Sequence, residues 1–176
     1  VPGTSIDATF HARIAAGVKA HPTFKIVGSV TGNWDQTTAP KAVASILPSM
    51  PPVEGVVDQG GDGYGAAQAF AAARKPLPVV IMGNRQDDLA WWQQQKASNG
   101  YETWSGSIAP GISTLVFWVA QLVLNGKKDP LDRIVPYLSF KPENYEAALR
   151  TIPKSGVKNR DYTRGDALAA VKANTK

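Results

Sequence analysis

The stretch Val53-Glu54-Gly55-Val56-Val57-Asp58-Gln59-Gly60-Gly61-Asp62-Gly63-Tyr64-Gly65-Ala66-Ala67 joins a short β-branched run to an Ala-rich segment through a glycine-rich turn. Valine-rich runs bounded by proline or glycine are typical of buried strands, and runs of alanine favour a helix. A strand, a tight turn and a helix in this order form the repeating unit of a parallel sheet. The stretch therefore predicts an α/β fold.

The same unit recurs on both sides of this stretch. Strands are expected at 25–30, 53–57, 77–82 and 101–107, and helices at 4–19, 37–47, 64–74, 87–96 and 112–125. A further strand is expected within 131–140, a short helix at 144–151, a polar loop at 154–164, and a final helix or frayed tail at 166–173. Because the strands are nearly continuous apolar runs, we expect helices on both faces of the sheet. The prediction is a three-layer α/β sandwich with a mostly parallel sheet.

Composition narrows the class of protein. The chain has 176 residues, of which 43% are hydrophobic and 19% charged, which is globular and long enough for one core. It has no cysteine, which excludes disulfides, thiolate metal sites and cysteine catalysis. The longest apolar stretch, 112–124, is too short to span a bilayer.

The net charge of +5 comes entirely from the C-terminal third. Residues 1–126 hold eight basic and eight acidic side chains, whereas residues 127–176 hold eleven basic and six acidic ones. A nucleic-acid patch would need clustered Arg and Lys with interleaved aromatic residues. Here the basic residues are spread out, so we expect a solvated tail and no nucleic-acid partner.

The turns that follow the strands are the candidate site, because parallel sheets bind ligands beyond the carboxyl ends of their strands. These turns are Gly32-Asn33-Trp34-Asp35, 58–62, Gly83-Asn84-Arg85 and 105–110. Their amides and carboxylates can pair with vicinal hydroxyls, and an indole can pack on the apolar face of a sugar ring. The turns therefore suit a neutral polyhydroxylated ligand, although Trp34 could instead pack beneath its own loop.

Catalytic interpretations find less support in the sequence. His11 and His21 lie in or beside the first expected helix, and no metal-ligand spacing or Gly-x-Ser-x-Gly elbow is present. The pair Asp87-Asp88 is interpreted as helix-start chemistry rather than an acid/base dyad. Gly61, Gly63 and Ala66 fit the Ala-ended dinucleotide fingerprint, so a nucleotide- or flavin-using enzyme stays as an alternative.

Several segments, taken in order, resemble the type 1 periplasmic sugar-binding proteins of ABC importers, the ribose-binding-like group. They are Pro2-Gly3-Thr4-Ser5 with Arg13 and Gly17, His21-Pro22 before Lys25-Ile26-Val27, Asn33-Trp34-Asp35-Gln36, 56–67, and Val79-Val80-Ile81-Met82-Gly83-Asn84. The resemblance covers residues 1–145. Two features depart from the family pattern: three residues separate Arg13 from Gly17, and Gln59-Gly60-Gly61-Asp62 replaces an Asn-Asp turn.

The resemblance implies a solute-binding component of an ABC importer that closes around a sugar or polyol in a cleft between two lobes. Trp34 would stack on the ligand, and hydrogen bonds to its hydroxyls would come from Arg13, Gln59, Asp62, Asn84 and Arg85. No catalytic residue, metal or cofactor is implied, so we expect no enzyme. The expected location is periplasmic or otherwise extracytoplasmic, and the expected protein partner is an ABC permease. The alternative is the sugar-sensing effector domain of a lac-repressor-type transcription regulator, which shares this fold.

The resemblance also implies a division of the chain. Residues 1–110 would form a C-terminal ligand-binding lobe, 111–145 a hinge-crossing helix with a return strand, and 146–176 a basic C-terminal extension. Nearly all of the first lobe lacks a counterpart here, so we expect a fragment. A second chain or upstream residues would supply that lobe.

Overall fold

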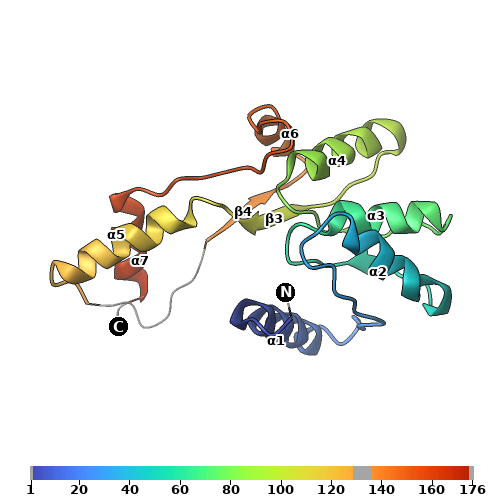
Figure 1. The fold of residues 1–176 in the computed structure, drawn as a ribbon, viewed down its shortest axis with the longest axis horizontal. Coiled ribbons are helices and arrows are strands. Elements are labelled where there is room, and N and C mark those ends of the chain that lie inside the picture. The colour runs from blue at the N-terminus through green and yellow to red at the C-terminus, as the bar shows by residue number, and fades with distance from the viewer. Residues whose placement is uncertain (1, 129–135, 175–176) are drawn as a thin grey trace.

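The computed structural model describes residues 2–128 and 136–174 (Figure 1). Its helices are α1 (Ser5–Ala20), α2 (Thr38–Ile46), α3 (Gly63–Ala72), α4 (Gln86–Asn99), α5 (Ile112–Leu124), α6 (Tyr145–Leu149) and α7 (Arg164–Asn174), with a short 3₁₀ helix at Leu47–Ser49. Its strands are β1 (Gly55–Val56), β2 (Val79–Val80), β3 (Ser105–Ile108) and β4 (Tyr137–Phe140). The expected alternation of helices and strands, and with it the α/β class, is confirmed.

The strands pair in the order in which they occur along the chain. β1 and β2 are parallel, with Gly55 opposite Val79, and Met82 then forms a parallel bridge with Ser105 at the start of β3. β3 and β4 are antiparallel, with Ser105 opposite Phe140. Parallel pairing is therefore confirmed for the first part of the sheet, whereas the last strand reverses direction.

The prediction of a strand at 25–30 is wrong. These residues form no regular element, and Phe24 and Ile26 are 66% and 58% exposed. A β-branched run becomes a strand only when a neighbour completes its backbone hydrogen bonds. Within 2–128 and 136–174 no segment pairs with it. The first part of the strand expected at 131–140 lies outside the described residues, and β4 forms its end.

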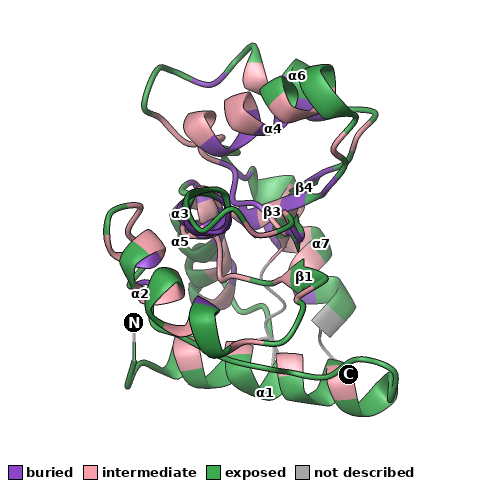
Figure 2. Ribbon diagram, turned by 90° about the vertical axis from the view of Figure 1, so that its right-hand side faces the viewer, coloured by how far each residue is buried: buried purple, intermediate pink, exposed green. Residues whose placement is uncertain are grey.

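One face of the sheet carries the buried core (Figure 2). Val80 and Met82 pack against Ala67 of α3 and Trp91 of α4. Next to them a second cluster joins α4, β4 and α6, and its members are Leu89, Trp92, Phe140, Tyr145, Ala148 and Ile152. Burying these large apolar side chains supplies the main favourable term in folding.

The opposite face is more open. Its exposed apolar side chains are Val57, Val79 and Trp104. Helix α1 lies on this side and reaches the sheet through Phe10, whose ring centroid is 6.2 Å from that of Tyr137 (Figure 2). The helix begins where predicted, because the Thr4 hydroxyl accepts a hydrogen bond from the backbone N–H of Asp7 at 3.2 Å.

Helices α5 and α7 form a pair at one end of the molecule (Figure 1). Leu115 and Leu122 of α5 pack against Tyr162, Ala167 and Val171. This contact corrects the prediction of a solvated tail: the C-terminal segment has its own apolar stripe and covers part of α5. Tyr145 and Ile152, in the same C-terminal third, are buried against α4.

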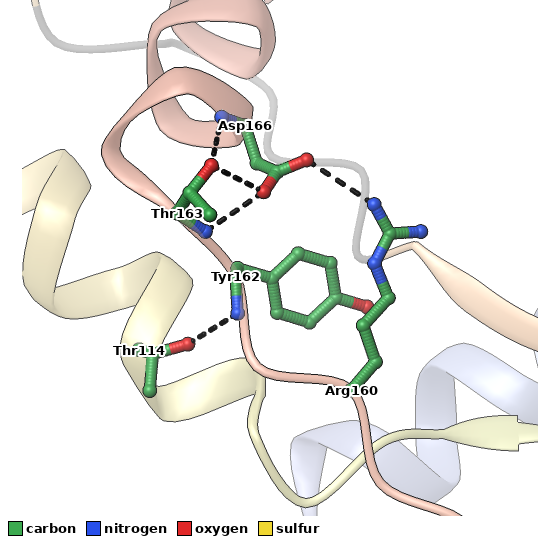
Figure 3. Close-up of polar contacts among 5 residues, drawn as sticks. All are labelled: Thr114, Arg160, Tyr162, Thr163 and Asp166. Carbon is green, nitrogen blue, oxygen red and sulfur yellow. Dashed lines mark hydrogen bonds and ion pairs between the residues drawn. The ribbon is translucent and has the colours of Figure 1, made fainter.

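Polar contacts fix the start of α7 (Figure 3). The backbone N–H of Tyr162 donates to the Thr114 hydroxyl at 2.7 Å. The Asp166 carboxylate accepts from the backbone N–H of Thr163 at 2.7 Å, and the Thr163 hydroxyl accepts from the backbone N–H of Asp166 at 3.2 Å. Arg160 pairs with Asp166 at 3.1 Å. This reciprocal capping satisfies backbone donors that the first helical turn leaves free.

The division of the chain at 110 and 145 stays a prediction. In the described residues, β4 and α6 pack on β3 and α4, and α7 packs on α5. None of the described helices combines the length and the apolar character that crossing a membrane requires.

We expect two tryptophans near the sheet, Trp92 and Trp104, to differ sharply in their effect on stability. Trp92 is 0% exposed and stacks on Tyr145 with ring centroids 4.0 Å apart, so Trp92→Ala should lower the free energy of unfolding by about 3–5 kcal/mol. The matched control is Trp104→Ala, because Trp104 is 61% exposed. Urea unfolding followed by circular dichroism measures both, and equal losses in the two variants would refute this packing.

Candidate functional site

The glycine-rich turn after β1 is the centre of the candidate site. Gly60 and Gly61 have φ angles of +91° and +142°, which place the turn in backbone conformations that favour glycine. The Asp58 carboxylate accepts a hydrogen bond from the backbone N–H of Gly60 and holds the turn closed. A Cβ atom on Gly83 would lie 3.0 Å from the backbone nitrogen of Gly61, so the turns after β1 and β2 touch.

Trp34 reaches this turn from the segment before α2. The backbone N–H of Asp35 donates to the Gly32 carbonyl at 3.1 Å, and Asn33 and Trp34 between them have φ angles of +57° and +58°. The backbone of Trp34 lies 3.5 Å from the position a Gly61 Cβ would occupy. Trp34 is 37% exposed at this edge of the sheet, and its role as a stacking residue stays a prediction.

Gln59 links Trp34 to helix α1. Its amide oxygen accepts from the Trp34 indole N–H at 3.1 Å, and its amide nitrogen donates to the Asp7 carboxylate at 2.9 Å. Two predicted site residues, Trp34 and Gln59, are therefore in direct contact. Asp7 also lies 3.6 Å from His11 on the same helix, and no sequence motif predicted Asp7 at the site.

Three carboxyl groups converge beneath the turn. Burial, opposed by the hydrogen bond from the Gly60 N–H and assisted by the nearby charges of Asp88 and Asp62, raises the pKa of Asp58 to about 7. Burial also raises the pKa of Asp88 to about 6, and the pKa of Asp62 is raised for the same reason. The backbone N–H groups of Trp34 and Asp35 face Asp62 and oppose that rise.

Asp88 lies both in the first turn of helix α4 and beside the candidate site. It lies in the first turn of α4, as helix-start chemistry predicted, and is fully buried. One of its oxygens accepts from the Gln36 amide and from the backbone N–H of Tyr64, each at 3.3 Å. Asp58 and Asp88 were not among the predicted site residues. Asp58 could have been found from its place directly after a strand, whereas the burial of Asp88 depends on contacts far apart in the sequence.

The other predicted site residues lie outside this group. Asn84 is 1% exposed; its amide nitrogen donates to the Leu138 carbonyl at 2.5 Å and its amide oxygen accepts from the Ser105 hydroxyl. Both ends of this amide are therefore used to hold β2, β3 and β4 together. Arg85 is the N-cap of α4 and lies 3.6 Å from Asp87. Arg13 lies on an exposed position of α1.

The described residues contain no group of three His, Asp or Glu side chains that could hold a metal ion. A cavity of about 290 Å³ lies at the other edge of the sheet, where Val53, Phe70 and Lys75 are among its lining residues. This is the amino-terminal edge of β1 and β2. Ligands of parallel sheets bind at the carboxyl edge, so the glycine-rich turn remains the candidate site.

Residues 1–128 match the family described as the periplasmic binding protein domain, and the chain belongs to this family. An ABC transporter solute binding protein from Thermobispora bispora is similar in structure, with 30% identity and a TM-score of 0.77 over 94% of this chain. The chain spans 51% of that protein's length. Among curated proteins, none matches the chain.

Two structures from Mycobacterium smegmatis share the fold at lower identity. One has 23% identity and a TM-score of 0.68 over 85% of this chain and 50% of its own. The other has 24% identity and a TM-score of 0.58 over 78% of this chain and 45% of its own, and it was solved in complex with β-D-fucofuranose. The described chain therefore corresponds to about half of each of these proteins.

Asp58 should make the chain less stable as pH rises. Its carboxyl group binds a proton more tightly in the folded chain, with a pKa of about 7, than at the ordinary value of 3.8. Stability is therefore greatest below pH 4 for this group and falls between pH 4 and pH 7. We expect Asp58→Asn to raise the urea midpoint at pH 8 more than at pH 4.

Asp35 provides a control, because its carboxyl group should make stability depend on pH in the opposite direction. Hydrogen bonds from the Thr37 and Thr38 side chains and backbones lower its pKa from 3.8 to about 2. The ionised form therefore stabilises the folded chain above pH 4 and this contribution is lost as pH falls through 2. Asp35→Asn should lower the midpoint at both pH values, and an equal gain at pH 4 and pH 8 for Asp58→Asn would contradict its assigned burial.

Proposed function

We propose that the protein is the solute-binding component of an ABC importer that binds a sugar or polyol between this lobe and a second one. The single observation that carries the proposal is the exposed Trp34 indole beside Gln59 and a turn rich in acceptor groups, at the carboxyl edge of the sheet. Membership of the periplasmic binding protein domain family supports it. An extracytoplasmic location and a permease partner belong to the same proposal.

The proposed mechanism needs no covalent chemistry, and we propose no enzymatic activity. The ligand binds to one lobe, and the second lobe then closes over it, so that the binding free energy stabilises the closed form. A preformed turn favours this mechanism, because contacts that already hold Trp34 and Gln59 in place reduce the entropy lost on binding.

Each residue has a distinct role in the proposal. Trp34 stacks on the apolar face of the ligand, and Gln59 and Asp62 hydrogen-bond its hydroxyls. Arg85, which is partly exposed at the start of α4, and Arg13 on α1 are proposed as outer contacts that domain closure brings nearer. Asn84 acts indirectly. Its hydrogen bonds to Ser105 and Leu138 join the turn after β2 to β3 and β4, and so fix the position of Gly83 in that turn.

The structures of relatives give a starting point for the ligand. One M. smegmatis neighbour was solved with β-D-fucofuranose, a hydroxyl-rich monosaccharide. A thermal-shift panel of D-fucose, pentoses, hexoses and inositols on the full-length protein tests the proposal. At least one compound should raise the melting temperature in a concentration-dependent way, and a flat response across the panel would refute the proposal.

Trp34→Ala should weaken binding of the best compound from this panel by about five- to tenfold. A stacked aromatic ring contributes about 1 kcal/mol beyond the area it buries. Isothermal titration calorimetry measures the change. Trp104→Ala serves as the control because Trp104 is exposed on the open face of the sheet, away from the turn. Unchanged affinity in Trp34→Ala would remove Trp34 from the site.

A further inference from the structure

The side-chain amide of Gln59 is held at both ends by groups of fixed hydrogen-bonding character. Its oxygen Oε1 accepts from the Trp34 indole N–H at 3.1 Å, and its nitrogen Nε2 donates to Asp7 Oδ1 at 2.9 Å. An indole N–H can only donate, and a carboxylate oxygen can only accept. Turning the amide over would set donor against donor and acceptor against acceptor, so a single orientation is favoured.

Three separate parts of the chain meet at this amide. Asp7 lies in the first turn of α1, Gln59 in the turn after β1, and Trp34 in the segment before α2. Without the Asp7 carboxylate, the Trp34 indole alone would hold the Gln59 side chain, whose several rotatable bonds allow other positions. Asp7 therefore decides whether the amide is fixed or mobile.

The Asp7 carboxylate is well placed to hold a partner. Its side chain is 18% exposed, whereas that of His11, one turn further along α1, is 60% exposed. A hydrogen bond to a charged acceptor is stronger than one between neutral groups, and shielding from water strengthens it further. The contacts therefore run outward from a shielded carboxylate, through a half-buried amide, to the partly exposed Trp34 indole.

Asp7 also has a local role that must be separated from this contact. An acidic side chain in the first turn stabilises a helix through its negative charge. The contact with Gln59, in contrast, needs an acceptor oxygen and not a charge as such. A substitution that removes the charge and keeps an oxygen therefore distinguishes the two roles.

The fixed amide keeps hydrogen-bonding capacity for a ligand. Trp34 and Asp7 use one lone pair of the Gln59 oxygen and one of its two N–H groups, so a second lone pair and a second N–H remain. A sugar hydroxyl both donates and accepts, and it matches this pair of groups. An amide that is ordered before the ligand arrives loses less entropy on binding.

We propose that Asp7 is a positioning residue of the site: it fixes the Gln59 amide in one orientation and thereby holds the Trp34 indole in the position where it stacks on the ligand. This inference rests on the proposed function, because it assigns Asp7 no contact with the ligand itself. Helix α1 thus becomes part of the site through one carboxylate.

Two substitutions at Asp7 of the full-length protein test the inference by calorimetric titration. The probe is D-fucose, or the pentose, hexose or inositol that most raises the melting temperature. Asp7→Leu removes the acceptor at similar size and should weaken binding about three- to tenfold, because the ligand must then order the Gln59 side chain. Asp7→Asn keeps an acceptor oxygen and should stay within about twofold of the unaltered protein.

The Trp34 indole N–H gives a second readout that needs no ligand. In isotope-labelled full-length protein its nuclear magnetic resonance signal is the one that Trp34→Phe removes. In Asp7→Leu this signal should move toward that of a solvent-exposed indole, and its hydrogen should exchange faster with water. In Asp7→Asn both properties should stay close to those of the unaltered protein.

His11→Gln is the matched control on the same helix. His11 lies 3.6 Å from Asp7 and is exposed, and ion pairs at the surface contribute little, so this variant should change neither the affinity nor the indole signal. Thermal unfolding followed by circular dichroism checks that each variant folds.

The possible outcomes separate the inference from the proposed function. If Asp7→Leu folds and leaves the affinity or the indole signal unchanged, Asp7 does not act through Gln59 and the inference is wrong, while the proposed function stands. If Asp7→Asn or His11→Gln costs as much affinity as Asp7→Leu, charge on α1 carries the effect and the positioning role is overturned. If no compound binds the unaltered protein, the proposed function fails and the inference falls with it.

Discussion

Close contact between two backbone turns organises this lobe. The turn after β1 passes so near Gly83 and the Trp34 backbone that a side chain at Gly61 or Gly83 would meet neighbouring atoms. Because the backbones approach closely there, segments before α2, after β1 and β2, and at the start of α4 bring their polar side chains to one place. The burial of Asp58 and Asp88, and the raised pKa values that follow, are consequences of that approach.

The sheet and the site depend on each other through buried polar groups. The Asn84 amide bonds Ser105 and Leu138 and holds the strands in register just beneath the candidate site. Asp35 uses its carboxylate to begin α2 and thereby orients the segment that carries Trp34. In an interior of low effective dielectric, such satisfied networks specify one arrangement of the chain. The geometry of the candidate site therefore depends on hydrogen bonds that lie outside it.

The order of most helices and strands, and the edge of the sheet where the candidate site lies, could be predicted from the sequence. Helix boundaries could be predicted from the sequence because capping residues such as Thr4 and Gly100 act locally. Trp34, Gln59 and Asp62 could be singled out as site candidates because they lie in turns between predicted elements. The prediction of a strand at 25–30 failed because strand pairing depends on a neighbour that local propensity does not reveal.

Asn84 was misjudged for a related reason: a polar residue at a strand end can face a ligand or the interior, and only the partners Ser105 and Leu138 distinguish the two. The packing of α7 on α5 likewise depends on two segments about 50 residues apart.

The clamp between α5 and α7 has a practical consequence. Arg160, Thr163 and Asp166 anchor the last described helix at the end of the molecule away from α2 and α3 (Figure 1). A surface tether or fluorescent label attached to α7 would therefore lie away from the segment before α2 that carries Trp34. The protein could therefore be immobilised through α7 in a sensor, with the candidate site left accessible to the solution.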